Sequence, residues 1–288
     1  MNKTKKIAAI VLSLFILLNV AACAGETSTI GDDSDNGLSG YRKHESGLLF
    51  SNLVDENTQN LVRQALIDAG ANSTKVADVF VWLNIFNGFV TSGSLLYSGF
   101  VQTDRNYVLY DTDVTWEENG TLYYDVNCHT VSFHLLRSLI TVENPIIEEV
   151  VEDGFGVITP FRVHSNVEWT QDERNNFVSV FDLLFDFTAS ETETAEAIVA
   201  AWAERGISFT ESKLSLVSVW SGSWVIHSAV LVEIDGGLLL FEKTNPLKPF
   251  QASIFNNTDE VRDYFIDQMH SAGLSDAMVT VMRNDVML

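Results

Sequence analysis

The hydrophobic pattern changes near residue 210 from the period of helices to the period of strands, and this change constrains the fold more than any other feature. The earlier part predicts helices over about residues 56–69, 74–86, 127–140, 170–185 and 190–205. The later part predicts strands over residues 214–220, 225–234, 238–244 and 250–255, and then a helix over about 259–270. We therefore expect the α+β class, with N-terminal helices followed by a small antiparallel sheet.

An Asp235-Gly236 pair lies between the second and third predicted strands. It indicates a two-residue hairpin turn, because Asp-Gly suits a type I′ turn. Such a turn puts Glu242 on the same face of the sheet as His227, about 7–8 Å away along the diagonal. A three-residue loop would instead place Asn245 opposite His227. In both cases the neighbouring strand offers His227 a polar side chain.

The N-terminus has the pattern of an export signal. Three lysines precede the apolar residues 7–18, and the small residues Val20-Ala21-Ala22 precede Cys23. The apolar run is too short to span a bilayer as a stable helix. The small residues before a cysteine resemble the bacterial lipobox, which implies cleavage after residue 22 and a diacylglycerol on Cys23. An ordinary secretory peptide that is cleaved elsewhere is the alternative.

These features predict the domain organisation and the location. Residues 1–22 form the lipoprotein signal peptide, residues 23–48 a flexible acidic spacer, and residues 49–288 a single globular α+β domain. No second apolar stretch is long enough to cross a bilayer, so we expect lipid on Cys23 to hold the chain on the outer side of the bacterial cytoplasmic membrane. With 17 basic and 39 acidic residues, the net charge of −22 excludes nucleic acid as a partner.

Cysteine use points to a second feature. The chain has two cysteines, and if Cys23 carries lipid then Cys128 is a lone thiol in an exported protein, which makes it a candidate reactive group. Asn127 is a good N-cap and places Cys128 in the first turn of a helix, where free amides and the helix dipole favour a thiolate. The alternative is a buried cysteine that serves as a small apolar residue.

A nucleophilic cysteine needs a base, and His227 is the best candidate among the six histidines. It lies among apolar residues near the start of a predicted strand, where a neutral, partly buried imidazole suits proton transfer. Glu242 would orient it, with Asn245 as the alternative. A core histidine with a satisfied hydrogen bond is the competing interpretation. Histidine spacing and the lack of an HExxH or CxxC motif predict neither a metal site nor a cofactor.

A cysteine at a helix start, then a histidine on a strand, then a polar residue on the next strand resembles the papain-like fold, especially the NlpC-type cell-wall peptidases. A wider resemblance, from about residue 50 to the C-terminus, is to bacterial surface lipoproteins of the "domain of unknown function 4300" family. It is carried by Asn127-Cys128, by the strand of His227, and by residues 205–210, 240–243 and 249–252. That family has an arginine after the cysteine, where this chain has His129.

The papain-like resemblance implies a thiol hydrolase of amide or peptide bonds, with cell-wall peptide as the candidate substrate. Cys128 would attack the carbonyl, His227 would transfer the proton, and Glu242 would orient the imidazole. The remaining candidates for binding in the site are Asn127, His129, Asn245 and Gln251. A non-catalytic surface binding module is the alternative function, and a thiol redox sensor is a third.

Overall fold

The computed structural model describes residues 28–29, 37–38, 41, 43, 46–90, 97–108, 110, 116–118, 121–123, 126–147, 169–182, 190–274 and 279–288. The predicted signal peptide, Cys23 and most of the predicted spacer lie outside these residues. Two residues of the spacer, Leu38 and Tyr41, are buried in the main core. In the described part of the chain, no helix has both the length and the apolar character needed to cross a membrane.

The helices begin where capping side chains accept free backbone N–H groups. They are α2 (Glu56–Asp68), α3 (Ser73–Phe89), α4 (Cys128–Leu136), α6 (Gln171–Phe181), α7 (Glu191–Glu204) and α8 (Thr258–Ser271). Thr170 and Glu173 form the reciprocal capping box that satisfies two amides at the start of α6. The five helices predicted before residue 210, and the helix near the C-terminus, are thus confirmed. The helix that starts at Asn127 is shorter than predicted, because residues 140–142 are a strand.

The sheet is larger than the small one predicted. It has nine strands in the order β1-β3-β2-β11-β10-β9-β8-β12-β13, and its described pairs are antiparallel. The predicted strands are β8 (Leu214–Ser221), β9 (Trp224–Ile234), β10 (Gly237–Lys243) and β11 (Phe250–Phe255). The added ones are β1 (Ser28–Thr29), β2 (Leu48–Ser51), β3 (Val101–Thr103), β12 (Thr280–Arg283) and β13 (Val286–Met287). Strands of two to four residues are too short to show a hydrophobic period, so the prediction missed them.

Two small sheets complete the secondary structure. β4 (Trp116–Glu118) pairs with β5 (Thr121–Tyr123), and β6 (Ile140–Val142) pairs with β7 (Ile207–Phe209). The second pair joins the end of α4 to the end of α7, two segments that are distant in the sequence. This pairing explains why the helix of Cys128 ends earlier than predicted. Residues 140–142 pair with β7, a strand more than 60 residues further along the chain, so the local sequence does not reveal the partner.

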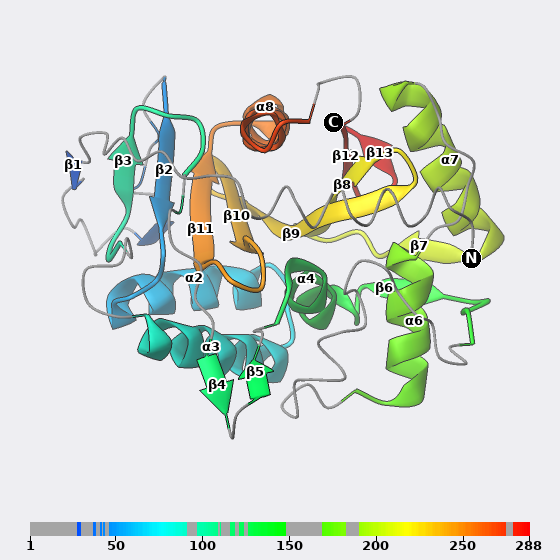
Figure 1. The fold of residues 1–288 in the computed structure, drawn as a ribbon, viewed down its shortest axis with the longest axis horizontal. Coiled ribbons are helices and arrows are strands. Elements are labelled where there is room, and N and C mark those ends of the chain that lie inside the picture. Colours follow the sequence, from blue (N-terminus) through cyan, green and yellow to red (C-terminus); the bar gives the residue numbers. More distant parts are fainter. Residues whose placement is uncertain are drawn as a thin grey trace.

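The hairpin between β9 and β10 has the predicted two-residue turn. Ile234 is paired with Gly237, and Gly236 takes the positive φ of 82° that such a turn requires. The described pairing of these strands runs only as far as Phe241 and Val230. Beyond that pair the two strands separate. In Figure 1, β8 and β9 run roughly horizontally, whereas β10 and β11 run roughly vertically.

Helices cover both faces of the large sheet. α2, α3 and α4 lie on one face and α8 on the other (Figure 1). Alternate residues of the central strands supply the two cores. Leu216, Val230 and Leu239 belong to the first core, which is the main core and includes residues of α2, α3 and α4. Val217, Leu231 and Leu240 belong to the second core, which includes residues of α8. These strands are apolar on both sides, as buried central strands are.

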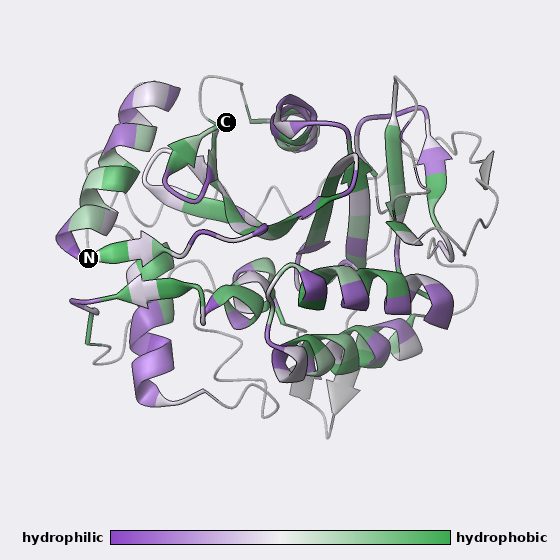
Figure 2. Cartoon of the chain, turned by 180° about the vertical axis from the view of Figure 1, so that it is seen from behind, coloured by the Kyte–Doolittle hydropathy of each residue, from purple (hydrophilic) through white to green (hydrophobic). Residues whose placement is uncertain are grey.

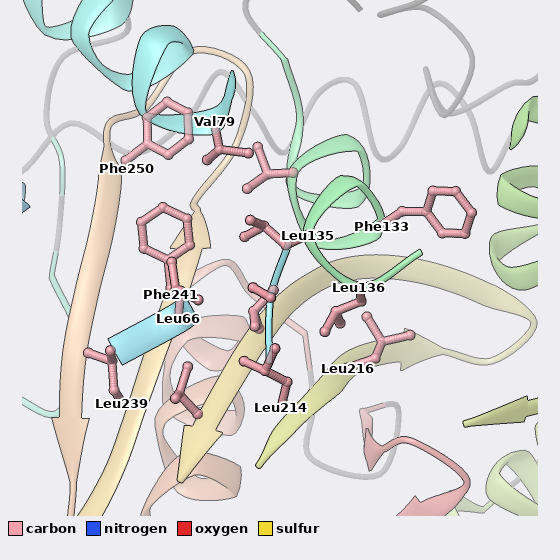
Figure 3. Close-up of a cluster of buried hydrophobic side chains, with 14 of the residues drawn as sticks. Leu66, Val79, Phe133, Leu135, Leu136, Leu214, Leu216, Leu239, Phe241 and Phe250 are labelled. Carbon is pink, nitrogen blue, oxygen red and sulfur yellow. The ribbon is translucent and has the colours of Figure 1, made fainter. Parts of the chain in front are cut away.

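The first core holds α4 against the sheet. In Figure 3, side chains of α2, α3 and α4 converge with side chains of β8, β10 and β11. Phe133 points away from this cluster, and its ring packs edge-on against Phe177 of α6. α4 is thus buried on both sides, and Figure 2 shows it as largely hydrophobic where α6 is largely hydrophilic. A helix clamped in this way has a fixed N-terminus, which is the end that carries Cys128.

Candidate functional site

Cys128 is the first residue of α4, as the cap predicts. The Asn127 side-chain oxygen accepts the Thr130 backbone N–H at 2.8 Å and also the Thr130 hydroxyl at 2.8 Å. This double contact ends the helix at Asn127 and leaves the amides of the first turn without partners inside the helix. Asn127 is therefore a structural cap for the cysteine. Cys128 is a free thiol, and 6% of its surface is exposed.

His227 lies on β9, next to a bulge. It pairs with Val219 of β8, while Val225 pairs with Trp220, so the register shifts between these pairs. The ring of His227 lies on the α8 side of the sheet, 5.5 Å from the ring of Phe265. Only 2% of His227 is exposed. A buried imidazole loses hydration, so it needs hydrogen-bond partners within the protein.

One of these partners is Glu242. Its Oε2 lies 2.6 Å from Nε2 of His227, and the carboxylate is 1% exposed. Glu242 directly follows Phe241, the last β10 residue that pairs with β9. His227 lies beyond the end of the same ladder. Both side chains therefore meet on the α8 face, where the two strands separate. The two side chains thus lie in contact with each other. The side chain of Asn245 instead accepts the Leu247 backbone N–H in the turn after β10.

Two donors hold the other oxygen of Glu242. The Tyr264 hydroxyl donates to Oε1 at 2.5 Å, and Nε2 of Gln251 lies 3.5 Å from the same atom. Gln251 also donates to Ser253 at 2.8 Å and receives the Tyr110 hydroxyl at 2.6 Å. Gln251 therefore supports Glu242 from behind. Tyr264 and Tyr110 were not predicted as part of the site, because α8 and residue 110 approach the sheet only in the folded chain.

The thiol of Cys128 interacts with two imidazoles, those of His129 and His227. Burial alone would raise its pKa, but the charges and hydrogen bonds of His129 and His227 outweigh burial, and the pKa of Cys128 is well below its ordinary value. The pKa of His227 moves the other way. Burial lowers it, whereas Cys128 and Glu242 together raise it to about 10. At neutral pH these shifts favour a thiolate beside an imidazolium.

α4 is tied to β9 beside this pair. The hydroxyls of Ser132 on α4 and Ser228 on β9 lie 2.7 Å apart, and both residues are buried. Ser228 directly follows His227, so this bond fixes the helix start relative to the strand that carries the imidazole. Contacts with residues from four elements, α4, β9, β10 and α8, therefore set the geometry of the site.

The chain is similar over most of its length to one known protein family. Residues 49–288 match the family model described as Domain of unknown function (DUF4300). The chain belongs to this family. No curated protein matches the chain, and no solved structure matches it.

The DUF4300 match contains the whole cluster around Cys128, including His129. His129 helps to lower the pKa of the Cys128 thiol, and its ring lies 4.9 Å from the ring of Phe181. His129 is 5% exposed, and its Nε2 has no hydrogen-bond partner among the described residues. The structure thus brings together Asn127, His129, His227, Glu242 and Gln251 around or behind the thiol. The Asn245 side chain accepts its hydrogen bond from Leu247, within the turn after β10.

His134 on the same helix has a structural environment. Its Nε2 lies 3.0 Å from the Asp78 carboxylate, and its Nδ1 accepts the Trp169 ring N–H at 2.9 Å. Burial lowers the pKa of His134 to about 4, so the ring is neutral at pH 7. In the part of this DUF4300 chain that the structure describes, no group of three or more His, Cys, Asp or Glu side chains is arranged to hold a metal ion.

Proposed function

We propose that the chain is a lipid-anchored thiol hydrolase of papain-like arrangement, with Cys128 as nucleophile, His227 as acid and base, and Glu242 as the residue that orients the imidazole. The observation that carries the proposal is the buried series from Glu242 through His227 to Cys128. A nucleophile at a helix start, a base within hydrogen-bond reach, and a carboxylate on the far nitrogen of that base are the parts that acyl transfer needs.

The proposed reaction has two steps. The Cys128 thiolate attacks the carbonyl carbon of an amide, so that a C–S bond forms and an electron pair moves to the oxygen. His227 gives its proton to the leaving nitrogen, the C–N bond breaks, and an acyl-enzyme remains. His227 then takes a proton from water as the water oxygen attacks the thioester carbon. The C–S bond breaks, the carboxylic acid is released, and the Cys128 thiolate is restored beside the His227 imidazolium. The Cys128 backbone N–H, which has no intrahelical partner, would donate to the oxyanion.

Nε2 of His227 is occupied by Glu242, which leaves Nδ1 for the thiol. The carboxylate favours the form of the ring that has its proton on Nε2 when neutral, so Nδ1 is free to take the thiol proton. Tyr264 and Gln251 give Glu242 two donors on its other oxygen, and these donors keep the carboxylate ionised and fixed in orientation.

The substrate class follows from the location that the N-terminal pattern predicts. An enzyme held by lipid outside the cytoplasmic membrane meets peptide and amide bonds of the cell surface, including those of the cell wall. The analogy with NlpC-type peptidases points to the same bonds. The predicted location and the NlpC analogy bear on the substrate only, and the proposed chemistry of Cys128 does not depend on them.

Alkylation of the thiol tests the proposed site. We expect iodoacetamide to modify Cys128 much faster at pH 7 than it modifies free cysteine, because the thiolate is the reacting form. His227→Ala should slow this labelling to the rate of an ordinary thiol, and Cys128→Ala should abolish it. The matched control is His270→Ala, which removes an exposed histidine of α8. Slow labelling that does not depend on His227 would refute the hydrolase and favour the non-catalytic binding module.

The anchor has a separate test. Cells that express the full chain are grown with a labelled fatty acid, and the protein is then extracted with a detergent that separates into two phases. We expect wild-type protein to carry the label and to enter the detergent phase, and Cys23→Ala to do neither. Label on the Cys23→Ala variant, or unlabelled wild-type protein, would contradict lipid attachment at Cys23.

A further inference from the structure

The histidines near Cys128 differ in how their ring nitrogens are used. Both nitrogens of His134 have protein partners, Asp78 and Trp169, as in a histidine that serves the fold. His227 has Glu242 on one nitrogen and the thiol beside it. His129 also contacts the thiol, but its Nε2 has no partner among the residues that the structure describes. The protein therefore anchors two of the three rings by hydrogen bonds and leaves the third, next to Cys128 in the chain, with a buried ring nitrogen that has no partner among the described residues.

A buried nitrogen without a hydrogen bond is costly, and folded proteins leave few of them. His129 carries this cost at the start of α4, beside the proposed nucleophile. The packing of the ring against Phe181 holds it in this position without a polar anchor.

We propose that His129 is a second catalytic imidazole, which donates the hydrogen bond that stabilises the oxyanion during acylation of Cys128. The inference rests on the proposed hydrolase activity and adds a residue that binds the reacting carbonyl. It makes His129 the side-chain partner of the Cys128 backbone N–H in the oxyanion site.

The chemistry of the attack provides the physical reason. In the proposed mechanism, an imidazole N–H of His129 donates to the negative thiolate before the reaction. When the C–S bond forms, the charge passes from sulfur to the carbonyl oxygen, and a sulfur bonded to carbon is a weak acceptor. The new oxyanion is bonded to the same carbon as the sulfur, so a donor directed at the sulfur needs only a small movement to reach it. The carbonyl oxygen of the bound substrate carries no full negative charge, and this charge develops during the attack. The hydrogen bond to this oxygen is therefore stronger in the transition state than in the ground state, as catalysis requires.

Two reagents separate this role from a simple effect on the thiolate. Iodoacetamide reacts at a saturated carbon and forms no oxyanion, whereas p-nitrophenyl acetate acylates the sulfur through an oxyanion and releases nitrophenolate. For each reagent the rate is measured up to the pH at which it no longer rises, which gives the rate constant of the thiolate itself. A change in thiol pKa then affects neither limiting value.

We expect His129→Phe to lower the limiting acylation rate by roughly 100-fold, the usual loss for one oxyanion donor, and to change limiting alkylation by only about threefold or less. His129→Gln supplies a side-chain N–H and should recover much of the acylation rate. It also keeps the test valid if the phenylalanine variant does not fold. His134→Gln, which removes the other buried histidine of α4, should leave the ratio of the two limiting rates unchanged.

Equal losses with both reagents in the His129 variants, or unchanged acylation, would overturn the inference while leaving the hydrolase intact. If wild-type Cys128 is not acylated at all, the proposed function fails as well, so the two failures are distinguishable.

Discussion

Glu242→Gln is the most informative substitution in the site, because it preserves the shape of the side chain and changes only its charge and its donors. Two donors, the Tyr264 hydroxyl and the Gln251 amide, face Oε1 of Glu242. In the variant the amide oxygen must occupy that position, which turns the amide nitrogen toward Nε2 of His227. An amide nitrogen only donates, so Nε2 has to accept, and the ring proton moves to Nδ1. The ring can then no longer take the proton of Cys128.

The substitution should change two measurable quantities, the pKa values of His227 and Cys128 and the rate of hydrolysis. A buried hydrogen bond to a charged group contributes about 1.5–3 kcal/mol, which corresponds to about one to two units in the pKa of the partner. The pKa of His227 should fall by that amount, and the pKa of Cys128 should rise toward its ordinary value. Hydrolysis should lose more, because the wrong tautomer of a catalytic histidine costs about 10⁴-fold in rate, or roughly 5 kcal/mol in the barrier.

The assay is the rate of iodoacetamide labelling of Cys128 as a function of pH. We expect the midpoint to lie well below that of an ordinary thiol in wild-type protein and to rise by about one to two pH units in Glu242→Gln. Glu233→Gln is the matched control, since Glu233 lies on the same strand as His227 but is exposed and pairs with Arg283. An unchanged midpoint in a folded Glu242→Gln protein would refute the role of the carboxylate.

Three further results follow from the contacts. Tyr264→Phe removes one donor from Glu242, and the labelling midpoint of Cys128 should rise by about one pH unit or less; no shift in a folded variant would contradict a positioning role. The pKa of His134 is about 4 in the folded chain, against an ordinary value of 6.5 for a histidine in the unfolded chain, so folding stability should fall as the pH drops from 6.5 toward 4. Urea unfolding should show a loss of about 2 kcal/mol between pH 7 and pH 5 that His134→Gln lacks, and equal losses in both proteins would contradict it. Phe241→Ala opens the fully buried core beside Phe80 and should cost about 3–5 kcal/mol in the same assay, whereas a loss under 1 kcal/mol would contradict tight packing there.

The sign of the His134 effect follows from proton binding. The unfolded chain binds a proton at the histidine below pH 6.5, whereas the folded chain binds it only near pH 4, so acid favours unfolding between these values. The effect of His227 has the opposite direction. Its pKa is raised to about 10 in the folded chain, so its contribution to stability is present at neutral pH and is lost as the pH rises through 10.

Short-range rules along the chain were sufficient to predict the local features of the site. Asn127 sets the start of α4, because a cap acts on amides two or three residues away. Asp235-Gly236 sets the register of the hairpin, and the two-residue period of a strand then places Glu242 on the face of His227. Each of these rules relates residues that are close in the chain or joined by one short turn.

Which distant groups meet depends instead on the packing of the folded chain. Cys128 reaches His227 because α4 packs between the sheet and α6, and no local pattern contains that packing. Tyr264 reaches Glu242 because α8 covers the opposite face of the sheet. The short strands β2 and β12 extend that sheet through partners far along the chain. Such contacts depend on burial summed over the whole fold, and so a search for periods and motifs along the sequence does not find them.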